Sequence, residues 1–171
     1  MESPKLHTLK KELQNVPSPA LANHLLRIAK YKTENKELLH YLLFYHDNTE
    51  EYVAEVKVLI QENFEGLPLS DYAKVKSVRK ITRILNKHIK FIADKRYEVE
   101  LSSYFCELFI DYKLAKSYNK SLLNLLYRQL KRTNKLLPKL HEDLSYDYSI
   151  EFERIIKNLK QYKPQFDINT I

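Results

Sequence analysis

The sequence predicts an all-α protein of seven or eight helices. Apolar residues recur at spacings of three and four along most of the chain, which is the pattern of amphipathic helices. The 171 residues include a single glycine, Gly66. Tight hairpins, phosphate-binding loops and the GxSxG nucleophile elbow all depend on glycine, so its scarcity disfavours an extensive sheet and the common α/β enzyme classes.

The N-terminal part of the chain predicts three helices. A short helix is expected from about Pro4 to Asn15. The next begins at Ser18-Pro19, because serine caps a helix and proline suits its first turn. Thr33 offers the cap for the third helix, which carries leucines at helical spacing.

The next two helices have defined ends in the sequence. One begins at Asn48 or Thr49, with glutamates in its first turn, and stops at Gly66. Ser70 caps a longer helix that runs to about Ala93, apolar on one face and rich in lysine and arginine on another.

The C-terminal part predicts three more elements. The stretch from Tyr97 to Lys116 is apolar on two sides, which is typical of a central helix. Ser121 begins a helix expected to reach about Leu144 with a bend near Pro138, which lacks an N–H for the helical hydrogen bonds. A last helix ends before Pro164.

These helices fit either an irregular bundle or a short stack of antiparallel pairs that resembles an α-solenoid. The length predicts a single helical domain, residues 1–161, with a C-terminal tail at 162–171. A lone cysteine, the lack of a leader-like apolar segment and the lack of an apolar run near 20 residues predict a cytoplasmic protein without a membrane contact.

The charge is concentrated in the middle of the chain. Residues 67–140 contain 17 basic and 6 acidic side chains, whereas acidic side chains outnumber basic ones in both flanking segments. Two rows within this segment have helical spacing. They are Lys76, Lys80, Arg83, Lys87 and Lys90, and Arg128, Arg132, Lys135 and Lys139. Such rows indicate a surface for an acidic protein or nucleic acid, or else solvated helix faces neutralised by the acidic flanks.

The hexapeptide Arg83-Ile-Leu-Asn-Lys-His88 resembles the Arg-x4-His motif of the helical HEPN ribonucleases. In that family the arginine and histidine act on RNA at a dimer interface, so the resemblance implies RNA cleavage by Arg83 and His88. It covers these six residues and the helical context, and the isoleucine after Arg83 departs from the polar residue often found there. The alternative is an arginine of the basic row beside a partly buried histidine.

Other candidate groups indicate no site. Glu37 and His40 form one Glu-x-x-His, but a di-iron bundle needs a second copy, so neither a metal nor another cofactor is expected. His141 and its acidic neighbours point in different directions on a helix. Cys106 lies in the predicted central helix, where a thiol acts as a small apolar side chain.

The segment LKKELQNVPSPALANHLLRIAKYKTENKELLHYLLF resembles a small family of all-helical bacterial cytoplasmic proteins with no assigned activity, and the likeness extends through LHEDLSYDY. The resemblance implies a bacterial cytoplasmic protein and no particular chemistry. Three hypotheses follow from the sequence. They are a non-enzymatic binding or scaffold module with a basic central surface, a HEPN-like or other phosphate-directed enzyme, and an assembly partner without a polyanion ligand.

Overall fold

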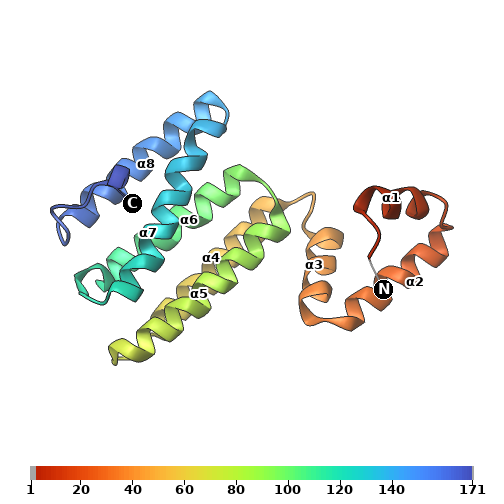
Figure 1. Ribbon diagram of the computed structural model, residues 1–171, viewed down its shortest axis with the longest axis horizontal. Coiled ribbons are helices and arrows are strands. Elements are labelled where there is room, and N and C mark those ends of the chain that lie inside the picture. Colours follow the sequence, from red (N-terminus) through yellow and green to blue (C-terminus); the bar gives the residue numbers. More distant parts are fainter. Residues whose placement is uncertain (1–2, 171) are drawn as a thin grey trace. The chain divides into compact units, whose positions relative to one another are not determined.

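The computed structural model describes residues 3–170, which form eight α-helices and three short 3-10 helices and contain no strand (Figure 1). The predicted all-α class is therefore confirmed. The chain divides into two compact units at the junction of Asn48 and Thr49, where the sequence predicted one domain over residues 1–161. None of the described helices is both long and apolar enough to cross a membrane.

The N-terminal unit consists of three helices. They are α1 (Leu6–Gln14), α2 (Ser18–Tyr31) and α3 (Thr33–Phe44). Helices α2 and α3 pack together as a hairpin, and the Asn35 side-chain amide donates to the Ile28 carbonyl at 3.0 Å across their junction. Neither α1 nor α2 contains a buried residue, and α3 buries Tyr41.

The C-terminal unit holds the five longer helices. They are α4 (Thr49–Glu65), α5 (Asp71–Ile92), α6 (Lys95–Asp111), α7 (Lys120–Leu136) and α8 (Glu142–Lys160). Helices α4 and α5 form one antiparallel pair and α6 and α7 the next (Figure 1). Because α6 contacts both α4 and α8 while α5 contacts α7, the unit has two layers. We call α4, α6 and α8 the A layer, and α5 and α7 the B layer. The described residues thus match the predicted all-α bundle of seven or eight helices, with the helices of this unit arranged in antiparallel pairs.

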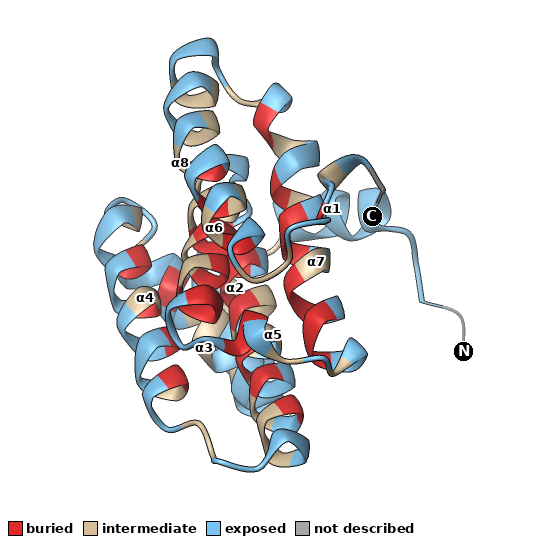
Figure 2. Ribbon diagram, turned by 90° about the vertical axis from the view of Figure 1, so that its left-hand side faces the viewer, coloured by how far each residue is buried: buried red, intermediate tan, exposed pale blue. Residues whose placement is uncertain are grey.

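The core of this unit is built around α6, as its apolar periodicity predicted. Phe105, Cys106 and Phe109 are fully buried, and α6 contacts every other long helix of the unit. Figure 2 shows buried positions along α6 and along the inner sides of its neighbours. Burial raises the pKa of the Cys106 thiol, so the sulfur packs as an apolar group rather than acting as a nucleophile.

One predicted helix was wrong. The segment from Ser121 to about Leu144 is not a single bent helix, because α7 ends at Leu136 and the 3-10 helix η2 (Leu137–Lys139) follows. Pro138 lies within this turn, Leu140 is extended and α8 begins at Glu142. Since Leu137 is buried, the apolar pattern continues across the break and hides it from a periodicity argument.

The residues predicted to be a C-terminal tail include a core contact. Phe166 is buried, and its ring lies 5.2 Å from that of Tyr127 on α7, centroid to centroid. The short helix η3 (Ile168–Thr170) also contacts α7. The segment after α8 therefore packs back onto the B layer and is part of the C-terminal unit.

Candidate functional site

The first basic row lies on the solvent side of α5. Lys76, Lys80, Arg83 and Lys90 are exposed and Lys87 is half-buried. The opposite side of the helix faces the core, where the buried apolar side chains are Val78, Ile81, Leu85 and Ile89. The sequence pattern therefore separates the two faces of α5 as expected of an amphipathic helix.

The second row divides into two roles. Arg128 and Lys135 on α7 and Lys139 on η2 are exposed. Arg132 is different, because its Nη1 donates to Asn86 Oδ1 on α5 at 2.6 Å and its Nε donates to the Glu98 carboxylate on α6. Arg132 thus ties three helices together and is not a free surface cation.

The exposed parts of the two rows lie on one face of the unit. Helices α5 and α7 are neighbours in the B layer, joined by the Arg132–Asn86 contact, and each turns its apolar side toward the core. We call this surface the basic face. It consists of Lys76, Lys80, Arg83, Lys87 and Lys90 from α5 with Arg128, Lys135 and Lys139 from α7 and η2.

The two layers carry opposite charge. Helices α5 and α7 together contain twelve basic side chains and one acidic side chain, Asp71. Helices α4, α6 and α8 together contain six basic and fourteen acidic side chains. A negative ligand is therefore attracted to the B layer and repelled by the A layer.

Arg83 and His88 do not meet on α5. Arg83 is exposed, whereas His88 is 8% exposed and its Nδ1 forms a 2.7 Å hydrogen bond with the Tyr52 hydroxyl on α4. Five positions along a helix turn the two side chains about 140° apart. Within one chain, the guanidinium and the imidazole therefore cannot act together on one bound phosphate.

Among the described residues, no three histidine, cysteine, aspartate or glutamate side chains are placed to hold a metal ion. His40, from the lone Glu-x-x-His, is exposed and packs its ring 5.1 Å from that of Phe44. His141 lies 3.7 Å from Asp143 at a fully solvated helix start. Neither histidine therefore belongs to a group of side chains that could hold a metal ion.

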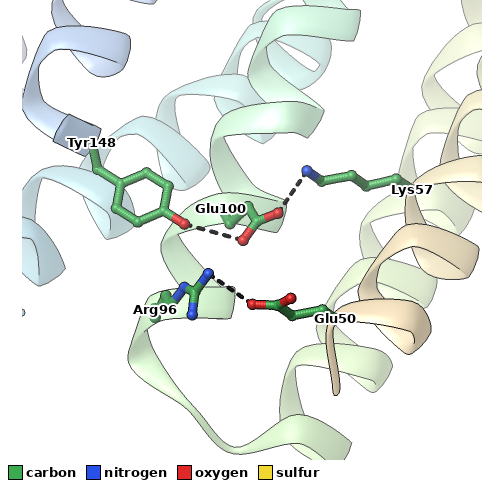
Figure 3. Close-up of polar contacts among 5 residues, drawn as sticks. All are labelled: Glu50, Lys57, Arg96, Glu100 and Tyr148. Atoms are coloured by element: carbon green, nitrogen blue, oxygen red, sulfur yellow. Dashed lines mark hydrogen bonds and ion pairs between the residues drawn. The ribbon is translucent and has the colours of Figure 1, made fainter. Parts of the chain in front are cut away.

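A polar cluster on the A layer was not predicted from the sequence. Glu100 on α6 accepts from Lys57 Nζ on α4 at 2.7 Å and from the Tyr148 hydroxyl on α8 at 3.1 Å (Figure 3). One turn before it, Arg96 Nη2 donates to Glu50 at 3.2 Å. These pairs connect all three A-layer helices.

The cluster borders a groove of about 300 Å³ between α4 and α6, lined by Lys57, Arg96, Tyr97 and Glu100 among others. Burial and the nearby Glu100 charge raise the pKa of Tyr148 to about 12, so its hydroxyl stays a proton donor. Both oxygens of Glu100 have partners. Glu100 therefore links α4, α6 and α8 through its two carboxylate oxygens.

A second group of charged side chains lies further along the A layer and contains the carboxylates of Glu107 and Glu151. Arg154 on α8 forms an ion pair with Glu107 on α6. Burial, and next the charge of Glu107, raise the pKa of Glu151, while Arg154 and Lys57 lower it to a lesser degree. The folded protein therefore favours the protonated form of Glu151 more than the unfolded chain does.

This shift predicts that Glu151→Gln stabilises the protein near neutral pH. With a raised folded-state pKa, the folded state binds more protons, so stability falls as the pH rises from the ordinary glutamate pKa through the raised value. Glutamine removes that loss. In urea titrations, the variant should exceed the parent in free energy of unfolding at about pH 7 and equal it at about pH 3.

The control for this prediction is Glu153→Gln, which changes an exposed carboxylate on the same helix. It should leave the free energy of unfolding nearly unchanged at both pH values. A clear loss of stability in Glu151→Gln at about pH 7 would contradict the prediction. It would mean that the Arg154 and Lys57 charges outweigh the burial of the carboxylate.

Comparison of the chain with protein-family models, with curated proteins and with solved structures finds no match. The candidate functions below therefore depend on the geometry and charge of the chain itself.

Proposed function

We propose that this chain is a non-enzymatic helical binding module and that its basic face binds a polyanion, either a nucleic acid or an acidic protein. The two-layer stack supplies a rigid support, because α5 and α7 are fixed by a core rather than by the ligand. The cytoplasmic location and the bacterial origin are sequence-based predictions and accompany this proposal.

The observation that carries the proposal concerns four cations of the α5 row, which are not neutralised within the part of the chain that the structure describes. Within residues 3–170, the side chains of Lys76, Lys80, Arg83 and Lys90 form no ion pair. Like charges in a row repel one another, and an external anion relieves that repulsion. Lys76 and Lys90 are separated by about 21 Å at the helical rise, which suits a ligand with several consecutive negative groups.

The two alternative hypotheses lack such an observation. An assembly partner without a polyanion ligand would be expected to neutralise these cations with its own acidic flanks, and the acidic side chains lie mainly in the other layer. A HEPN-like enzyme needs Arg83 and His88 at one phosphate, and the first is exposed while the second is buried.

The proposal predicts binding that weakens steeply with salt. Fluorescence anisotropy with labelled heparin and with a labelled oligodeoxythymidylate 12-mer should give a linear fall of log affinity with log salt. Each neutralised phosphate contributes a slope of about −0.7 on a single strand, so five or six contacts on the 12-mer give a slope of about −4.

Affinity for neither probe at low salt would overturn the proposal. A slope near zero would also overturn it, because binding would then not depend on the basic face. Poly-glutamate provides the comparison with an acidic protein, since it presents carboxylates at similar charge density without phosphates.

A further inference from the structure

A second surface feature lies at the end of the C-terminal unit. A pocket of about 560 Å³ is lined by three tyrosines, Tyr118, Tyr127 and Tyr162, together with the segment that follows α8. Tyr118 belongs to the loop after the short helix η1 (Leu114–Lys116), and Tyr127 belongs to α7. The pocket is therefore lined largely by aromatic side chains, and it lies between the loop before α7 and the segment after α8.

Two lysine–tyrosine contacts cross this junction in opposite directions. Lys163 Nζ lies 4.5 Å from the Tyr118 ring centroid, and Lys116 Nζ lies 5.6 Å from that of Tyr162. The Lys163 ammonium also donates to the Ser117 carbonyl at 3.0 Å. The two segments thus hold each other, and one ammonium group lies over the Tyr118 ring and another over the Tyr162 ring.

The base of the pocket is part of the core. Phe166 is 8% exposed, and its ring is tilted by 30° relative to that of Tyr127. Burial raises the pKa of Tyr127, which keeps its hydroxyl protonated. Asp167 is the acidic residue in the lining, and its carboxylate accepts from the Asn169 backbone N–H at 2.9 Å. The aromatic surface is therefore built into the fold.

Tyr118 is the exposed part of this surface, with 92% of its area accessible. A large aromatic side chain in such a position contributes nothing to the packing of the core. An exposed ring beside an ammonium group is suited to stacking with a planar base while the ammonium contacts the adjoining phosphate.

The pocket adjoins the basic face. Tyr127 is followed by Arg128, and Lys131 lies one helical turn further along the same side of α7. A strand whose phosphates follow the α7 cations therefore reaches the tyrosines. A duplex cannot use them, because its bases are already stacked on one another, and an acidic protein has no planar bases to offer.

We propose that this pocket is a nucleobase-stacking site and that the ligand of the basic face is a single-stranded nucleic acid. This inference rests on the proposed polyanion binding. It adds a second kind of contact, stacking on Tyr118 and its neighbours, which the charge of the basic face does not supply.

The test compares an oligodeoxythymidylate 12-mer with an abasic 12-mer of the same backbone, using the full chain and anisotropy at fixed salt. Parent protein should bind the base-containing strand roughly tenfold more tightly, as expected for one or two stacked bases. Tyr118→Ala should remove most of this difference without changing the affinity for the abasic strand, and Tyr118→Phe should retain it. Tyr146→Ala, which alters a tyrosine on α8 in the A layer that is 68% exposed, should behave as the parent does.

The outcomes separate the two proposals. Equal affinity of the parent for both strands, or full retention of the preference in Tyr118→Ala, would overturn the stacking site while leaving polyanion binding in place. Tighter binding of poly-glutamate than of either strand would overturn the nucleic-acid ligand in favour of an acidic protein. Lack of binding to the 12-mers, heparin and poly-glutamate alike would overturn both proposals.

Discussion

Phe105→Ala should lower the free energy of unfolding by about 3–5 kcal/mol, the usual cost of removing a fully buried aromatic ring. The Phe105 ring is inaccessible to solvent and lies 5.5 Å from that of Phe64 on α4 and 6.2 Å from that of Phe109, centroid to centroid. Its loss removes both ring contacts and leaves a cavity in the core between α6 and α4. Urea unfolding followed by circular dichroism measures the change.

Tyr72→Ala is the control for this prediction, because it removes an aromatic side chain that is 85% exposed. It should change the free energy of unfolding by less than about 0.5 kcal/mol. A loss below about 1 kcal/mol for Phe105→Ala would contradict the central position of α6. If the variant does not fold, Phe105→Leu provides the test, since it keeps an apolar side chain and should lose less stability.

Helix positions were predictable because their signals are local. Gly66 directly follows the last residue of α4, and Ser70 directly precedes α5, although its side chain makes no capping hydrogen bond. The break between α7 and α8 was missed because Leu137 is buried within it. The apolar spacing therefore continues at the point where the α-helix ends. Apolar periodicity shows which side of a segment faces the core. It cannot distinguish a continuous helix from two helices joined by a tight turn whose residues also face the core.

The polar cluster was not predictable in the same way. Its contacts join residues 43 and 48 positions apart, from Lys57 to Glu100 and from Glu100 to Tyr148. Pairing at that separation depends on which helices become neighbours. One local signal was present, because Arg96, Glu100 and Tyr104 recur every four residues and mark a third, polar side on α6.

The net charge of the middle segment can be counted in the sequence, but the distribution of that charge over the surface cannot. Residues 67–140 are basic on average, yet α6 within them contains four acidic side chains and belongs to the A layer. Alternate helices of a stacked array lie in alternate layers. A stretch that reads as uniformly basic along the chain is therefore separated in space into a basic layer and an acidic one.

The charge reversal Lys76→Glu with Arg83→Glu should weaken binding of the oligodeoxythymidylate 12-mer by more than tenfold. These exposed side chains are two helical turns apart on one side of α5. Their replacement removes two phosphate contacts and adds two repulsive charges. The log–log salt slope should also become shallower by about 1.4, since each lost contact releases one fewer condensed counterion.

Lys95→Glu with Lys157→Glu is the matched control, because it produces the same change in net charge on exposed positions of the A layer. If attraction by net charge alone governed binding, both double variants would weaken it equally. If the basic face makes the contacts, the control should lose less than about threefold and keep the salt slope of the parent.

Stability decides how a loss of binding is interpreted. Exposed charges rarely contribute more than about 1 kcal/mol each, so both double variants should unfold close to the parent in urea. Unfolding of Lys76→Glu with Arg83→Glu would mean that this row packs against other parts of the chain, which favours an assembly role. A folded variant with parental affinity and slope would leave the row an ordinary solvated face, because direct phosphate contacts cannot survive reversal of the charges that make them.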